Sequence, residues 1–393
     1  MGAFAVDWIN LGLRWFHLVV GIAWIGASFH FIWLDFSLRA RERMNEGVSG
    51  TSWMVHGGGF YHVEKYGVAP ATLPPDLHWF KWEAYLTFLS GFGLLVMQYY
   101  WNASAFLVDP AVLDMSGAEA VIISVLTLGA GWFAYDALCR SPLRDRTELL
   151  ALSVFALIVG AAFVFTHVFS GRGAFIHVGA MVGTIMAANV FAVIIPNQKI
   201  ITADLLAGRT PDPRYGKIGK QRSLHNNYLT LPVLLFMVSN HYAFLYSHPQ
   251  SWLVVALIVL TGGLVRHFLN RVDAGDEPKT VAWALPAAAV AMAAAIVWTA
   301  PRGAAYPAGV TDADALKITQ THCAMCHAAK PTHEAFRGGE PPKGVMLDTV
   351  ANIRRHAAQV NAQAVQGRAM PLGNETKMTD DERARLGAWL AQP

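Results

Sequence analysis

TELLALSVFALIVGAAFVFTHVF, residues 147–169, is the stretch that decides the fold. Between Glu148 and His167 it contains no charged side chain. In a helix, about 20 such residues extend about 30 Å, the thickness of the hydrocarbon core of a bilayer. The stretch therefore predicts a helix that spans a membrane.

Similar apolar runs fill most of the first 300 residues, and 54% of the chain is hydrophobic while only 15% is charged. One such run could be a buried helix of a soluble protein, but a series joined by short polar loops favours a membrane protein. We expect an all-α fold for residues 1–300, a polytopic membrane bundle of about eight transmembrane helices. The predicted spans are 11–34, 82–101, 117–138, 147–169, 176–196, 223–247, 251–270 and 281–299. The first has no preceding basic region and no small-residue cleavage site, so we expect a retained anchor.

Basic residues are concentrated in every second loop. The loops after spans one, three and five contain Arg39, Arg41, Arg43, Arg140, Arg144, Arg146, Lys199, Arg209, Arg214, Lys217, Lys220 and Arg222. The opposite loops contain only Arg172. By the positive-inside rule the basic loops are cytoplasmic, so both termini lie outside, and the lipid bilayer is a partner. The net charge of +3 is an average over basic loops on one side of the membrane and loops with a single basic residue on the other. It does not indicate nucleic-acid binding.

Residues 301–312 are rich in Pro, Gly and Ala and have no apolar period, so they predict a linker to a second domain, 313–393. This domain contains Cys323-Ala-Met-Cys326-His327. The spacing suits two thioether bonds to one haem, with His327 as an iron ligand. A zinc site would need a second ligand pair, for which only His322 and His333 are near, and a redox dithiol would need a βαβ setting. The motif therefore predicts covalent haem c.

Met370, in a loop before Pro371, is the expected second iron ligand, with Met378 and Met346 as alternatives. Residues 379–390 predict a short amphipathic helix with Thr379 as N-cap. From about residue 308 to the end, the chain resembles a small class I cytochrome c. A haem with both axial positions filled transfers electrons and leaves substrate chemistry to another site. Covalent haem places this domain in the periplasm, on the outer face of a bacterial inner membrane, in agreement with the loop charges.

Many of the 15 histidines fall inside the predicted spans, where an unpartnered imidazole is costly. By depth they form two groups of four. The periplasmic group is His17, His167, His177 and His241, and the cytoplasmic group is His30, His78, His225 and His267. Such groups suit one or two b-type haems, or one haem and a catalytic site, whereas the alternative is hydrogen bonding between helices. His17 and His30 lie about 20 Å apart along one helix and about 140° apart around it, so different helices would surround each site.

One cytoplasmic loop, residues 52–85, is unusually rich in aromatic residues and glycine. The three glycines after His56 would let backbone N–H groups approach an anionic ligand. His56, Lys65 and Glu83 could transfer protons, and Tyr61 could stack on a flat ring, as could Trp53, Phe60 and Trp79. The alternative is an aromatic belt at the membrane interface. We expect a substrate site here.

The segments WIGASFHFIWLD, VHGGGFYHVEKY, LHWFKWEAY and HNNYLTLPVLLFMVSNHY, followed by CAMCH, resemble the membrane-integral, cytochrome c-fused urate oxidase (urate hydroxylase) family of bacteria. The resemblance covers essentially the full length. It implies oxidation of urate to 5-hydroxyisourate, with electrons leaving through haem c to a respiratory-chain acceptor such as a soluble cytochrome c or a terminal oxidase. Only the haem residues Cys323, Cys326, His327 and Met370 carry over from the family. His56, Lys65, Tyr61 and Glu83 are inferred from this sequence alone.

Two other functions fit the same residues. The chain could pass electrons from a membrane quinol to its cytochrome domain without substrate chemistry, or it could be a haem-bearing assembly or sensor protein. Since haem c accepts one electron at a time and urate releases two, a further redox centre would suit the oxidase hypothesis.

Overall fold

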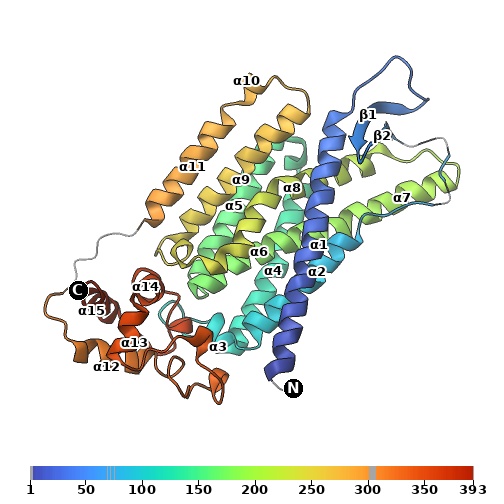
Figure 1. Cartoon of the computed structure of the whole chain (residues 1–393). Coiled ribbons are helices and arrows are strands. Elements are labelled where there is room, and N and C mark those ends of the chain that lie inside the picture. Colours follow the sequence, from blue (N-terminus) through green and yellow to red (C-terminus); the bar gives the residue numbers. More distant parts are fainter. Residues whose placement is uncertain (1–2, 69, 71, 75, 301–306, 393) are drawn as a thin grey trace.

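The computed structural model describes residues 3–68, 70, 72–74, 76–300 and 307–392. The first part of the chain forms a helical domain (Figure 1). Its elements are α1 (Ala3–Ser37), β1 (Val48–His56), β2 (Gly59–Tyr66), α2 (Trp82–Leu95), α3 (Ala103–Phe106), α4 (Gly117–Arg140), α5 (Thr147–Thr166), α6 (Gly171–Ala188), α7 (Ile195–Leu206), α8 (Pro213–Val238), α9 (Ser251–Asp273), α10 (Pro278–Val281) and α11 (Ala284–Thr299).

Within the described residues of this domain, six helical segments are long and apolar enough to cross a membrane: Phe4–Ser37, Gly117–Arg140, Thr147–Thr166, Gly171–Leu206, Ser251–Asp273 and Pro278–Thr299. The stretch that opened the sequence analysis is among them, as α5. The predicted spans 82–101 and 223–247 are also largely helical but are not among the six. The first corresponds to α2, which has 14 residues before it widens into a π-turn. The second corresponds to α8, which begins with polar residues and ends at Val238.

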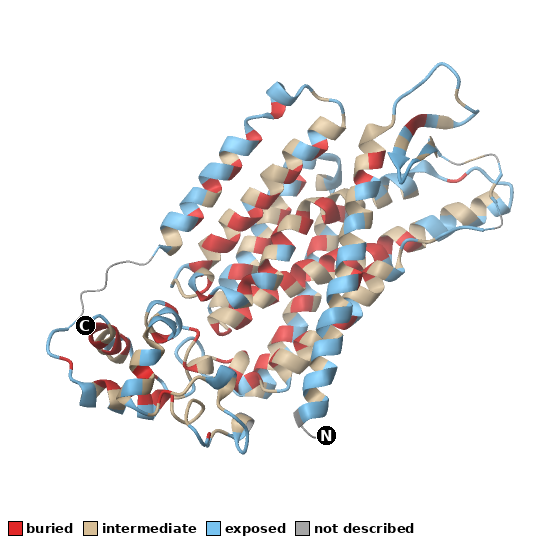
Figure 2. Cartoon of the chain, viewed as in Figure 1, coloured by how far each residue is buried: buried red, intermediate tan, exposed pale blue. Residues whose placement is uncertain are grey.

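Helix α6 forms the centre of the helical domain and is buried along most of its length between α4, α5 and α8. Phe175, Val178 and Ile185 are fully inaccessible. The outer helices show the opposite pattern (Figure 2), because large apolar side chains remain exposed on α1 and α11. These include Leu11, Leu18, Ile22, Val290, Ile296 and Val297. Such apolar outer surfaces are rare on soluble monomers.

The segment expected to be a loop contains the strands β1 and β2, which form an antiparallel hairpin. The fold is therefore mostly helical, and the β1–β2 hairpin is a departure from the predicted all-α fold. His56 pairs with Gly59 across the turn, and Gly57 and Gly58 have φ of 59° and 81°. A two-residue turn of this kind requires positive φ at both positions, which glycine adopts without strain. The turn thus gives a structural reason for two of the three consecutive glycines.

The C-terminal domain has its own small core and comprises α12 (Asp312–His322), α13 (Val350–Arg355), α14 (Ala357–Val360) and α15 (Asp380–Leu390). The predicted last helix is confirmed. Thr379 caps α15 by accepting a hydrogen bond from the backbone N–H of Glu382, and Leu386 and Trp389 are fully buried. Of the predicted linker, residues 301–306 lie outside the described residues. The domain lies at the end of the helical bundle where the N-terminus also lies (Figure 1).

Candidate functional site

The Cys-x-x-Cys-His motif follows directly after α12, whose last residue is His322. Cys323 and Cys326 are free thiols. The Nδ1 atom of His327 lies 3.0 Å from the carbonyl oxygen of Val345, so Nδ1 carries the proton and Nε2 keeps its lone pair. Burial lowers the pKa of His327, which favours the neutral imidazole that binds metals. These side chains fit a covalent haem held by two thioethers and one imidazole.

Met370 lies in a segment that joins the two domains, residues 367–374, which we call the docking segment. The side chain of Met370 packs against the core of the C-terminal domain, whereas its neighbour Ala369 belongs to the core of the helical domain. Arg383 donates a hydrogen bond of 2.7 Å to the carbonyl oxygen of Met370. The alternative ligand Met378 is almost fully buried in the C-terminal core. The predicted ligand Met370 is thus held at the boundary between the domains.

Polar contacts fix the docking segment on the helical domain. The backbone N–H of Arg368 donates to Oγ of Ser247 at 2.9 Å. Asp109 of the helical domain lies within electrostatic reach of Arg368 and Arg383. Burial raises the pKa of the Asp109 carboxyl, although the two arginines act in the opposite direction. The charges on the two sides of this contact are therefore complementary.

Gly373 of the docking segment leaves no room for a side chain. Its φ is 58°, and a Cβ atom would lie 2.8 to 2.9 Å from the carbonyl oxygens of Ser104, Ala105 and Val108. Gly373→Ala should therefore push the segment off α3. For the reduction of haem c by urate that the sequence resemblance implies, we expect the rate to fall about tenfold or more, which corresponds to about 1.4 kcal/mol, while haem content stays normal.

Gly338→Ala is the matched control for this prediction. Gly338 is in the same domain with φ of 79°, but no atom would lie within 4 Å of its Cβ. Both variants have the backbone strain, and only Gly373→Ala disturbs the contact between the domains. Stopped-flow absorption measures the rate of haem reduction by urate in each variant. Reduction by dithionite measures how much haem is present. Equal rates in both variants would contradict a role of the docking segment in electron transfer.

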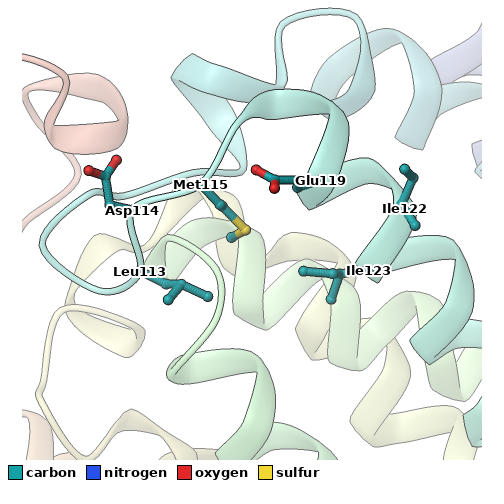
Figure 3. A pocket seen from close by; sticks show the side chains of 6 residues that line it. All are labelled: Leu113, Asp114, Met115, Glu119, Ile122 and Ile123. Atoms are coloured by element: carbon teal, nitrogen blue, oxygen red, sulfur yellow. The ribbon is translucent and has the colours of Figure 1, made fainter.

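An open hollow of about 250 Å³ lies near the start of α4 (Figure 3). Leu113, Asp114, Met115, Glu119, Ile122 and Ile123 line it. Glu119 already accepts hydrogen bonds from Ser116 in the capping box that begins α4. This carboxylate is therefore occupied by a structural role, and the hollow offers few other polar groups.

The histidines of the predicted periplasmic group have separate surroundings. Nδ1 of His17 lies 3.0 Å from Oγ of Ser90. His177 is fully buried, donates from Nδ1 to the carbonyl oxygen of Gly173 and accepts at Nε2 from Ser124. His167 bonds to the carbonyl oxygen of its own helix at Phe163, and His241 is exposed in a turn. No hydrogen bond or ring contact joins two histidines of this group in the described part of the chain.

The predicted cytoplasmic group is also divided. His30 is exposed beside the rings of Phe31 and Trp33, and His78 is exposed beside Phe80. Nδ1 of His225 lies 2.8 Å from the hydroxyl of Tyr135, and Nδ1 of His267 lies 3.1 Å from that of Tyr228. Hydrogen bonding between helices, the alternative left open by the sequence, accounts for His225 and His267.

The four side chains expected to act on the substrate do not converge in the described structure. His56 is exposed at the turn, whereas Lys65 pairs with Gly50 at the other end of the hairpin. Six residues of strand separate Lys65 from the turn, about 20 Å. Lys65 forms an ion pair with Asp35 at the end of α1, and Lys220 lies 3.3 Å from the same carboxylate. Tyr61 is exposed on β2, and Glu83 lies in the first turn of α2.

Buried polar side chains instead form two networks beside α8. The first surrounds Arg222, which donates to Asp136 at 2.6 Å and to Asn189 at 3.2 Å. Asn189 also donates to Tyr135 and Asn226. Only 2% of the Arg222 side chain is exposed, and its charge is neutralised by Asp136.

The second network surrounds Arg266 of α9. Nε and Nη2 of Arg266 donate to Oδ1 of Asn227, at 3.1 and 3.0 Å, and Nη2 also donates to Oδ1 of Asn270 at 2.6 Å. The ring of Phe29 in α1 covers the guanidinium, with its centroid 4.4 Å away. Sequence patterns do not reveal either network, because Arg222 falls in a predicted loop and Arg266 in a predicted apolar span. The polar sequence His225-Asn226-Asn227-Tyr228 inside a predicted span was the available signal.

The part of the chain that the structure describes defines a class of protein in which six apolar helices of membrane-spanning length precede a small helical domain that bears a Cys-x-x-Cys-His motif. The chain belongs to the urate oxidase N-terminal family, which it matches over residues 3–300. No curated protein and no solved structure matches the chain. The family match ends where the predicted linker begins.

Proposed function

We propose that this protein is a membrane-bound oxidoreductase that converts urate to 5-hydroxyisourate and passes the electrons through haem c to a respiratory-chain acceptor. Membership of the urate oxidase N-terminal family supports an oxidoreductase and urate as its substrate. The reaction balances as urate plus water giving 5-hydroxyisourate, two protons and two electrons. Cys323, Cys326, His327 and Met370 would hold the haem, which supplies one-electron acceptance when bound.

The exposed apolar outer faces of α1 and α11 support insertion in a bilayer. Both the N-terminus and the C-terminal domain lie at the end of the bundle opposite the hairpin (Figure 1). This arrangement agrees with the charge asymmetry of the loops, which predicts a periplasmic position for both. One or two b-type haems remain part of the proposal, since two electrons leave urate and haem c accepts them singly.

The observation that carries this proposal is the docking segment, which contributes Ala369 to the core of one domain and Met370 to the core of the other. A chain that oxidises a substrate in its helical domain needs a fixed route to its electron carrier. The Arg368 and Ser247 hydrogen bond and the close approach of Gly373 to α3 supply that fixed contact.

Anaerobic addition of urate to the purified, oxidised protein tests the proposal. We expect the absorption of reduced haem c to develop, and about half an equivalent of urate per chain to complete it if haem c is the only acceptor. If more urate is needed, the excess gives the number of additional redox centres. A pyridine haemochrome spectrum would identify b-type haem among them. Reduction by a quinol and not by urate would contradict the proposal and favour an electron-transfer subunit.

A further inference from the structure

Arg266 is a buried cation without a counter-ion. Its side chain lies inside the helical domain, and its hydrogen bonds go to neutral amide oxygens of Asn227 and Asn270. Among the described residues no carboxylate forms an ion pair with it. Asp273, the acid whose charge acts on Arg266, lies two helical turns further along α9 and forms no ion pair with it. Burying an unpaired charge is costly, so this site is electrostatically incomplete.

Arg222 shows how the same bundle treats a structural arginine. That guanidinium is as deeply buried as Arg266, but the carboxylate of Asp136 contacts it directly. Two buried arginines of the neighbouring helices α8 and α9 thus differ in their counter-ion, because a carboxylate contacts Arg222 and none contacts Arg266. The difference points to an anionic ligand as the counter-ion of Arg266.

Asn227 provides a second, independent indication. Its Oδ1 atom accepts from Arg266 and from Asn270, which fixes the orientation of the amide. The Nδ2 atom must then point elsewhere, and it is fully buried with no hydrogen-bond partner. Buried donors of this kind are rare and normally have a ligand or a water molecule as partner. In the described structure Nη1 of Arg266 also donates no hydrogen bond to protein.

Resting on the proposed function, we propose that Arg266 and Asn227 bind the purine anion urate between α1, α8 and α9. Nη1 of Arg266, which donates to no protein group in the described structure, can donate to an oxygen of a planar, delocalised anion, and the amide N–H₂ of Asn227 can donate to a carbonyl oxygen. Phe29 holds the guanidinium plane in place by covering one face. Tyr228 and His267 follow Asn227 and Arg266 in sequence and hydrogen bond to each other, which puts a proton-accepting pair nearby.

The test compares the binding of labelled urate to variants of the full-length protein after reduction by dithionite, which prevents turnover. Arg266→Gln removes the charge and should weaken binding about 30-fold or more, since hydrogen bonds to charged groups contribute about 1.5–3 kcal/mol. Asn227→Asp supplies an internal counter-ion and replaces the buried donor with an acceptor. This variant should fold at least as stably as the wild type and yet lose urate binding. Arg271→Gln, an exposed arginine on the same helix, is the matched control and should bind normally.

The outcomes separate the two proposals. Weak binding by Arg266→Gln and Asn227→Asp, with normal haem content and normal binding by Arg271→Gln, supports the site. Wild-type affinity in Asn227→Asp overturns the site and leaves the proposed function intact. Displacement of urate by equimolar inorganic phosphate overturns the purine assignment, because it would show a general anion site such as one for a lipid headgroup. Wild-type protein that neither binds urate nor is reduced by it overturns the proposed function and the site together.

Discussion

In the Cys323→Ala variant, covalent haem and urate-driven electron output are expected to fall to background while the helical domain still folds. The physical reason is that a missing thiol cannot form its thioether, and Cys323 is buried in the core of the C-terminal domain. The helical domain has a separate core, to which the C-terminal domain contributes Ala369. Pyridine haemochrome spectra and haem staining of denatured protein measure the loss.

Cys139→Ala is the matched control for haem attachment. Cys139 is also a free, buried cysteine, but it lies near the end of α4 beside His225. We expect this variant to keep a full complement of covalent haem. A native c-type spectrum from Cys323→Ala, or an equal loss from both variants, would contradict attachment at the Cys-x-x-Cys-His motif.

Asp136→Asn is expected to destabilise the helical domain strongly. The substitution leaves Arg222 buried without its counter-ion, and breaking such a buried pair from one side costs about 3–5 kcal/mol. Unfolding in detergent, followed by circular dichroism as denaturant increases, measures the change. The double variant Asp136→Leu with Arg222→Met should recover much of the loss, because it removes both charges together.

Asp145→Asn serves as the surface control for Asp136→Asn. Asp145 and Arg144 form an exposed ion pair at 3.3 Å between α4 and α5. Exposed pairs contribute about 0–1 kcal/mol, so this variant should unfold almost as the wild type does. Similar destabilisation by Asp136→Asn and Asp145→Asn would show that burial of Arg222 does not matter to stability.

Apolar runs and capping residues predicted most of the helices because both are local in sequence. The run 147–169 became α5, and Thr379 caps α15 as expected. The hairpin was missed although its signals are also local: aromatic and β-branched residues flank a pair of glycines. The aromatic content drew attention to ligand binding and away from strand pairing.

The candidate site depended on contacts that sequence spacing does not reveal. Depth along a helix groups the histidines only by their position along the helix axis, whereas rotation about each helix decides which of them meet. Arg266 and Asn227 lie 39 residues apart and were not considered together. What distinguishes Arg266 from Arg222 is the presence or absence of one carboxylate in three dimensions, and no linear pattern records it.

The docking segment also has a consequence for the proposed transfer of electrons out of the molecule. An electron-carrier domain on a flexible linker can accept electrons at one position and donate them at another by moving between the two. Here Ala369 packs into one core and Met370 into the other, so the intervening peptide bond has little freedom to move. We expect the C-terminal domain to stay fixed on the helical domain, with the external acceptor diffusing to its solvent-facing side. The rate of electron transfer to the acceptor would then be limited by the encounter between this protein and the acceptor, and not by domain motion.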